Sequence, residues 1–344
     1  LCTMKKTLLA TTIAIQTALC AQEPQEIKTP AQIQAELDQA QRDFETAKKM
    51  FIPWYTGPLI TSSASNVPPG NWVIQPYLFL LLDYAQYDDN RKSVNITDIW
   101  TIEPLFLLQT GITDWLDITG IAEGIFRWQG NQKAQEVGDT SITFGIQLLK
   151  QTPYVPSLRL TIGESFPTGR YQKLDPDKGG IDASGSGAFA TVVGMNFNKI
   201  YWDIPLHPVS LRLVANYSIP NHQVEVKNFN AYGGGFNAKG DVCVGQTFNA
   251  DLGVEVSLTQ QWVFAIDLAY TVSRETSFKG NPGLTPLGIP ASVGGPISDQ
   301  FSIAPAIEYN ISEKGGFIGG VWFTATGRNS TNFVGLILSF TWLF

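Results

Sequence analysis

Apolar and polar residues alternate along most of this 344-residue sequence, from Trp72 to the last residue. In the segment 242–258, VCVGQTFNADLGVEVSL, the apolar set is Val244, Phe248, Ala250, Leu252, Val254 and Val256. Alternation with a period of two places every second side chain on the same face of a β-strand. The sequence therefore predicts long strands, each with one apolar face.

Turn-like segments divide this alternation into about twelve strands. Short connections at 113–115, 151–156, 199–207, 259–261 and 312–315 alternate with long ones at 168–184, 220–241 and 275–297. A soluble β-sandwich is the alternative fold for many alternating strands, but strands of about a dozen residues are too long for it. We therefore expect an all-β fold over residues 71–344, a transmembrane antiparallel up-and-down β-barrel of about 12 strands with a periplasmic α-helix before it.

Composition excludes two other classes of protein. A bundle of membrane-spanning helices needs runs of about 18 or more apolar residues. Hydrophobic residues make up only 44% of this chain, its mean hydropathy is +0.00, and its richest apolar stretch ends at Asp83. The formal net charge is −7 and no basic cluster occurs, so nucleic acid is not expected as a partner.

Three segments precede the predicted barrel. Residues 1–21 are typical of a secretion signal peptide, because Lys5 and Lys6 stand before an apolar run that ends in small residues. Residues 22–56 are expected to form a periplasmic helical segment. Residues 57–70 are rich in Gly, Pro and Ser, which is typical of a connector.

The helix is predicted for residues 29–51. Thr29 and Gln32 match a capping box, and Pro30 stands at the first helical position. Apolar residues at spacings of four and three form a heptad seam, which consists of Ile33, Leu37, Ala40, Phe44, Ala47 and Phe51. We expect this seam to dock on the periplasmic end of the barrel, to mediate self-association through residues 33–51, or to bind another periplasmic partner.

The end of the sequence resembles the C-terminal assembly signal of bacterial outer-membrane proteins. Phe340, Trp342 and Phe344 share one face of the last predicted strand. The resemblance implies that the barrel assembly machinery recognises this strand and that the strand closes the barrel by pairing with the first one. We accordingly expect the protein in the bacterial outer membrane, surrounded by its lipid, with both termini in the periplasm.

Three segments also resemble one family of outer-membrane proteins. They are GPLITSSASNVPPGNWVIQPYLF, TGITDWLDITG and FPTGRYQKLDPDKGGIDASGSG. They look like segments of the transporter family named for the meta-pathway of phenol degradation, which is distantly similar to fatty-acid and hydrocarbon channels. The resemblance covers most of the chain after residue 57 and implies transport of a small-molecule substrate. The helical segment is not part of that family's pattern.

Charged residues in the strands are expected to face the interior of the barrel, because a charge on the lipid face costs about 2–4 kcal/mol at mid-depth. Strand parity selects the lumen-lining candidates Asp83, Glu103, Asp117, Glu123, Arg127, Arg159, Arg212, Asp251, Glu255, Asp267 and Glu308. These groups could pair and fill a narrow lumen, or they could line a path that favours cations.

The long loop 278–299 is unusually apolar for an external loop. Its apolar residues are Leu284, Leu287, Ile289 and Val293, and they stand among prolines and glycines that prevent a helix or a ladder. We expect this loop to fold inward as an apolar gate at the barrel mouth. In the alternative, it packs against neighbouring loops or a second barrel.

Candidates for other chemistry are few. His207 and His222 lie in connections without a paired serine or carboxylate at strand spacing, so enzymatic activity is not expected. The acidic turn LDPDKGGID lacks the spacing of a calcium loop, and no metal or cofactor is expected. The sequence predicts an outer-membrane channel for small molecules, hydrophobic or cationic, and the alternative is a structural or adhesive barrel with a plugged lumen.

Overall fold

The computed structural model describes residues 29–344 except 50, 153, 203 and 205, and the predicted signal peptide lies outside this range. The described chain forms two compact units, one ending at Lys49 and one spanning Met50–Phe344. The first unit contains helix α1, Pro30–Lys49. The Thr29 amide donates to Gln32 Oε1 at 2.7 Å, as the predicted capping box requires. Ile33 and Leu37 of the seam are exposed within this unit, and the binding partner of the seam stays a prediction.

No helix in the described part of the chain is long and apolar enough to cross a membrane.

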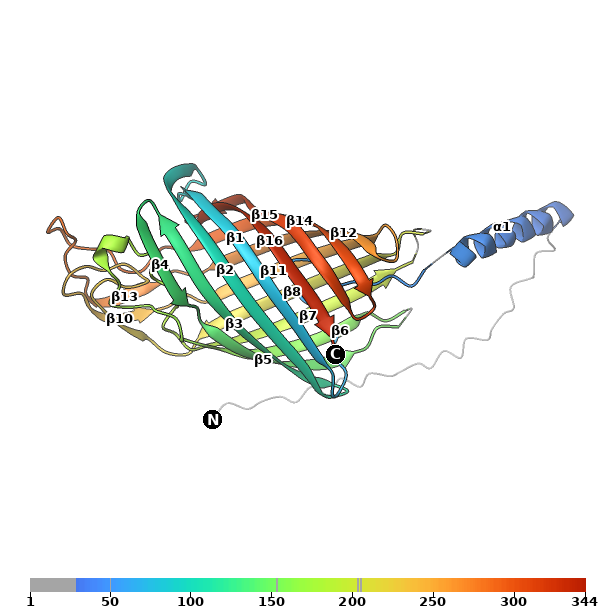
Figure 1. Cartoon of the computed structure of the whole chain (residues 1–344), viewed down its shortest axis with the longest axis horizontal. Helices are drawn as coiled ribbons and strands as arrows, with labels where there is room; N and C mark the ends of the chain where they lie inside the picture. The colour runs from blue at the N-terminus through green and yellow to red at the C-terminus, as the bar shows by residue number, and fades with distance from the viewer. Residues whose placement is uncertain (1–28, 50, 153, 203, 205) are drawn as a thin grey trace, which may run out of the picture. The chain divides into compact units, whose positions relative to one another are not determined.

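The second unit is a closed barrel of twelve antiparallel strands, which confirms the predicted fold class (Figure 1). The strands are β1 (Trp72–Tyr87), β2 (Ser93–Thr113), β3 (Leu116–Gln129), β5 (Thr140–Leu149), β6 (Ser157–Phe166), β7 (Ala190–Tyr201), β8 (Val209–Pro220), β11 (Thr247–Ser257), β12 (Trp262–Ser273), β14 (Ser298–Ser312), β15 (Gly315–Arg328) and β16 (Thr331–Leu343). Each strand pairs with its neighbour along the chain, and β1 pairs with β16 to close the ring.

The first and last barrel residues lie side by side. The Phe344 amide donates to the Trp72 carbonyl at 2.8 Å, and Val73 is opposite Leu343 in the ladder between β1 and β16. The predicted pairing of the last strand with the first is therefore present. Recognition of Phe340, Trp342 and Phe344 by the assembly machinery stays a prediction.

The alternation in the sequence sorts side chains to the two sides of the barrel wall. In β16, Val334, Leu336 and Leu338 are exposed, whereas Gly335 and Ile337 between them are buried. Large apolar side chains are exposed in the same way on the other strands, for example Phe106, Phe144, Ile162, Leu213, Phe264 and Ile307. An exposed apolar belt of this extent is unfavourable in water and favourable in lipid, so the strands span a membrane.

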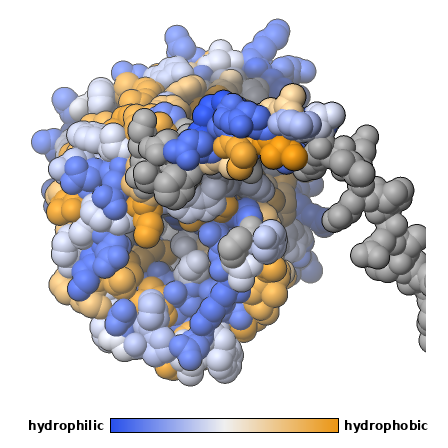
Figure 2. All heavy atoms as spheres, turned by 90° about the vertical axis from the view of Figure 1, so that its right-hand side faces the viewer, coloured by the Kyte–Doolittle hydropathy of each residue, from blue (hydrophilic) through white to orange (hydrophobic). Residues whose placement is uncertain are grey.

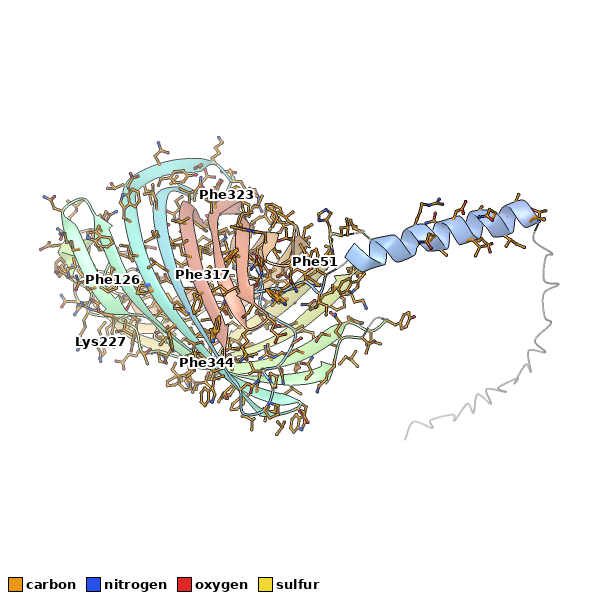
Figure 3. The ribbon with its side chains drawn as sticks, turned by 45° about the vertical axis from the view of Figure 1, so that its right-hand side comes forward. Phe51, Phe126, Lys227, Phe317, Phe323 and Phe344 are labelled. Atoms are coloured by element: carbon orange, nitrogen blue, oxygen red, sulfur yellow. The ribbon has the colours of Figure 1, made fainter. Side chains whose placement is uncertain are left out.

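The connections define the two ends of the barrel. We call the end with the β2–β3, β5–β6, β7–β8, β11–β12 and β14–β15 connections the turn end, and the opposite end the loop end. Figure 2 looks at the turn end and shows polar residues mixed with apolar ones, as expected where a barrel meets water. Figure 3 shows Phe51 at the turn end and Phe126 and Lys227 towards the loop end.

The loop end carries a second, smaller sheet. Strands β9 (Val224–Lys227), β10 (Lys239–Cys243) and β13 (Ser277–Asn281) pair in the order β13-β10-β9, and Ala188, Val224, Val226 and Val242 form its buried core. The sequence pattern had predicted one strand over 242–258, but the chain changes sheets between β10 and β11. At Gly245 a Cβ atom would lie 2.0 Å from the Arg274 carbonyl oxygen, so the close approach of two backbones separates the strands.

One barrel strand is bent. The loop-end part of β3 pairs with β4 (Gln132–Val137), and its turn-end part pairs with β5. Gly138 and Asp139 stand at the bend between β4 and β5. A Cβ atom on Gly138 would lie 2.2 Å from a Glu123 carboxylate oxygen, so glycine lets the chain pass this inward side chain.

Candidate functional site

The chain crosses the interior of the barrel before it enters β1. We call residues 54–67 the inner segment. It is hydrogen-bonded to inward side chains of β3, β5, β6, β7, β12 and β14. Because these strands stand on different sides of the ring, the segment spans the lumen near the turn end before the chain enters β1.

Two carboxylates hold the first half of the inner segment. The Thr56 amide donates to Glu308 Oε2 at 3.0 Å. The Ile60 and Thr61 amides donate to the two carboxylate oxygens of Asp267 at 3.2 and 3.1 Å. Backbone N–H groups inside a barrel need a partner, and here the partners are side chains instead of a neighbouring strand.

A buried ion pair holds the second half. Arg159 Nη2 lies 2.6 Å from Asp117 Oδ1, and the other oxygen of Asp117 accepts from the Val67 amide at 3.1 Å. Arg159 Nε donates to Asn66 Oδ1 at 2.8 Å. The Asp117 side chain is fully buried and that of Arg159 is 6% exposed, so the pair and the inner segment exclude water together.

A second ion pair stands between these two contact regions. Arg212 Nε lies 2.7 Å from Glu255 Oε2, and both side chains are buried. Gly57 packs directly on this pair, because a Cβ atom there would lie 2.9 Å from Arg212 Nη1. Gly57 also has a φ of +110°, a backbone conformation that is unfavourable for residues with a Cβ atom. Glycine at this position therefore lets the inner segment turn over the guanidinium group.

The remaining lumen candidates lie nearer the loop end. Glu103 is opposite Phe79 in the β1–β2 ladder, and Glu123 is opposite Leu105 in the β2–β3 ladder. The Arg127 guanidinium donates to the carbonyl of Ala183. Four carboxylates of this set have no salt bridge among the residues that the structure describes: Asp83, Glu103, Glu123 and Asp251.

A cavity of about 460 Å³ inside the barrel is bounded on one side by residues 56–63 of the inner segment. The side formed by β1, β2, β3 and β15 is mainly apolar, with Tyr77, Phe79, Leu105, Leu107, Ile121 and Trp322 beside the polar Gln75, Gln109 and Thr119. The facing wall is polar and includes Thr143, Thr161, Asn196 and Asn216, with Arg159 and Arg212. Leu59 of the inner segment is buried and packs near the apolar wall. The lumen thus contains a cavity with an apolar and a polar side, which sequence parity did not predict.

The β6–β7 loop, residues 167–189, covers part of the barrel mouth. Asp139 accepts from the Gly169 and Ser186 amides at 2.9 and 2.8 Å, and Ala183 accepts from the inward Arg127. The Tyr232 hydroxyl donates to the Ser186 carbonyl, and burial raises the pKa of this tyrosine. These contacts fix the loop over the lumen.

The loop predicted as a gate, residues 278–299, exposes most of its large apolar side chains. Leu284 is 48% exposed, Leu287 86% and Ile289 57%, so these side chains are not buried in the mouth. Val293 packs against the core of the three-stranded loop-end sheet. This contact agrees with the alternative prediction, in which the loop packs against neighbouring loops. A gating role for this loop stays a prediction.

The candidates for other chemistry are placed apart from the lumen contacts. His207 Nδ1 lies 2.9 Å from the Ser257 carbonyl oxygen, and the His222 ring packs 6.2 Å from the ring of Phe189. Cys243 is a free, exposed thiol in β10. Within the described residues, no group of three or more His, Cys, Asp or Glu side chains could hold a metal ion.

Comparison with known structures gives a match whose fold this chain shares. An outer membrane channel from Pseudomonas putida F1 is similar over 83% of this chain and 100% of its own, with 13% sequence identity and a TM-score of 0.63. The CymD monoaromatic hydrocarbon channel is similar over 80% of this chain and 89% of its own, with 10% identity and a TM-score of 0.35. No protein-family model and no curated protein matches the sequence. At 13% identity and a TM-score of 0.63, the likeness to the channel from Pseudomonas putida F1 shows the fold, a barrel of the outer-membrane type.

Proposed function

We propose that this protein is an outer-membrane channel for small molecules. The cavity of about 460 Å³ within the lumen is the observation that carries the proposal, because a purely structural barrel needs no such space. The similarity to an outer membrane channel over most of the chain supports it. Its strands span the outer membrane, its turn end and both termini face the periplasm, and its loop end faces outward.

The solutes are small and hydrophobic or cationic. The wall of Tyr77, Phe79, Leu105, Leu107, Ile121 and Trp322 favours apolar molecules. The candidate lumen residues contain more carboxylates than arginines, and low-dielectric walls focus the resulting negative potential. Cations and neutral solutes therefore pass more readily than anions.

The inner segment closes the channel at rest. Its backbone is bonded to Glu308, Asp267 and Asp117 from opposite sides of the lumen. Passage of a solute requires at least part of residues 54–67 to leave these partners. The same bonds favour the second candidate function, a permanently plugged barrel with a structural or adhesive role.

Single-channel recording in a planar bilayer separates the two functions. The parent protein is compared with Asp267→Ala, which removes the acceptor for the Ile60 and Thr61 amides. A lost acceptor leaves buried donors unpaired at about 1–3 kcal/mol, so we expect the variant to open more often than the parent. Absence of conductance in both proteins, each shown to be folded by its heat-modifiable migration, would establish the plugged barrel instead.

The orientation can be tested on the parent protein through Cys243, the exposed thiol at the loop end. A membrane-impermeant maleimide added to intact cells should label it, because the loop end faces outward. Cys243→Ser is the control. Labelling that occurs only after the outer membrane is disrupted would reverse the proposed orientation.

A further inference from the structure

The apolar wall of the cavity presents aromatic faces. The rings of Tyr77 and Phe79 are stacked, with centroids 5.7 Å apart and planes at 17°. Trp322 meets Phe79 edge-on at 6.4 Å, and its indole N–H donates to Ser302. Aromatic faces bind flat apolar groups and also attract cations through the ring quadrupole. The wall therefore suits a ring, a positive charge, or both.

The opposite, polar wall includes Asn196, whose side chain is tied to the inner segment. Asn196 is 1% exposed, and its Nδ2 donates to Ser62 Oγ at 3.0 Å and to the Ser63 carbonyl at 2.8 Å. These two bonds fix the orientation of the amide. Its Oδ1 is buried and has no hydrogen-bond partner among the described residues. Because this oxygen is buried, a ligand in the cavity does not reach it in this conformation, and the polar wall offers the cavity the fixed amide and its neighbours rather than a free acceptor.

Carboxyl groups outnumber cations at the loop-end side of the cavity. Phe79 and Leu105 line the cavity, and Glu103 and Glu123 are their cross-strand neighbours. Because Glu123 is opposite Leu105, two residues from Glu103, the two carboxyl groups share one face of the β2–β3 ladder. Arg127, opposite Thr101 in the same ladder, is a neighbouring cation, and it also donates to the Ala183 carbonyl. Among the described residues, neither carboxyl group has a salt bridge.

We propose that the cavity binds a small amphipathic organic cation, an aromatic amine whose ring lies along Tyr77, Phe79 and Trp322 while its ammonium group balances Glu103 and Glu123. This inference rests on the proposed channel function and names the solute class of the same site. The volume of about 460 Å³ fits a compact molecule of this kind. A neutral hydrocarbon would leave Glu103 and Glu123 without a further cation, and the carboxylate of an aromatic acid in the same pose would add a like charge beside them.

The test uses four probes that separate ring from charge. They are 2-phenylethylammonium, the neutral 2-phenylethanol, the anionic phenylacetate and the ring-free ethylammonium, titrated calorimetrically into the full-length protein in detergent. We expect 2-phenylethylammonium to bind about tenfold or more tightly than each of the other three, because both the ring and the charge contribute. Equal affinities of the amine and the alcohol, or no binding of the amine, would overturn the inference.

Matched variants locate the charge that the amine recognises. In the double variant Glu103→Gln and Glu123→Gln, the preference for the amine over the alcohol should fall to about twofold or less, while the alcohol binds as before. The control Glu225→Gln and Glu275→Gln removes the same charge from exposed loop-end positions and should keep the full preference. An unchanged preference in the lumen variant, with its heat-modifiable migration intact, would overturn the assignment.

Parallel bilayer recordings distinguish this inference from the proposed function. Conductance without selective amine binding refutes the solute class and leaves the channel in place. Selective amine binding without conductance supports the binding site and refutes the channel.

Discussion

The two levels of the lumen use the same residue types in different ways. Near the turn end, Asp117 is paired with Arg159 and Glu255 with Arg212, and all four side chains are buried around the inner segment. Nearer the loop end, Glu103 and Glu123 lie next to residues that line the cavity. Neither of these two carboxyl groups forms a salt bridge among the described residues. The difference teaches that the presence of the inner segment, and not strand parity, decides whether an inward charge is buried in a structural pair or stays beside the cavity, where we propose that it meets a solute.

The largest effect expected from this comparison is on stability. Arg159→Ala leaves the buried carboxylate of Asp117 without its counter-ion, and breaking a buried pair in this way costs about 3–5 kcal/mol. We expect a correspondingly lower free energy of unfolding in lipid vesicles, measured by urea titration. Glu103→Gln, at the other level, should change it by about 1 kcal/mol or less. Equal losses for both variants would remove the distinction between the two levels.

Gly57 and Gly70 give a sharper comparison within the N-terminal part of the barrel unit. Both have positive φ, +110° and +79°, but only Gly57 packs on Arg212, whereas a Cβ atom at Gly70 meets nothing within 4 Å. Each alanine substitution costs about 1–3 kcal/mol for the backbone conformation. Gly57→Ala should in addition displace the inner segment and increase channel opening in bilayer recordings. If Gly70→Ala opens the channel equally, contact with Arg212 is not what holds the segment.

The loop-end level should control ion selectivity. The double variant Glu103→Gln and Glu123→Gln lowers the negative potential of the lumen, so the permeability ratio of cations to anions should fall, by up to about tenfold. The reversal potential in a salt gradient measures this ratio. An anion preference of the parent protein would contradict the proposed charge of the lumen, and no change in the variant would indicate that both carboxylates are structural.

The smallest effect is expected for the apolar loop 278–299 at the loop end. Replacing residues 285–290 with a tight turn removes the exposed Leu287 and Ile289 without touching Val293, which packs on the loop-end sheet. If these side chains gate the mouth, the shortened variant should show a higher single-channel conductance and admit larger solutes. An unchanged conductance would show that the loop has no gating role.

The period of the sequence was sufficient to predict the barrel. A strand of the outer-membrane type repeats its environment every two residues, so Leu336, Ile337 and Leu338 alternate between lipid and interior in the sequence as they do in the structure. The prediction of strand boundaries was wrong at a glycine. Gly245 permits the close backbone approach that separates β10 from β11. The alternation of apolar and polar residues continues through Gly245, so the sequence pattern did not indicate this boundary.

The inner segment could not be placed from the sequence, because Gly, Pro and Ser are equally frequent in an external connector. Its position depends on long-range bonds, such as that from the Thr61 amide to Asp267. One signal was present: inward carboxylates such as Asp267 and Glu308 outnumbered the arginines available to pair with them. Buried charges need partners, and in this barrel several of the partners are backbone amides of residues 54–67.

The central claim is that the inner segment closes a lumen that otherwise conducts. Ser65 Oγ and Ser157 Oγ lie 3.5 Å apart, one on the inner segment and one on β6. The measurement is single-channel conductance of the Ser65→Cys, Ser157→Cys double variant in a Cys243→Ser background, before and after reduction, with the disulfide verified by mass spectrometry. Tethering the segment should abolish opening, and reduction should restore it. Equal conductance with the disulfide formed and with it reduced would contradict the account.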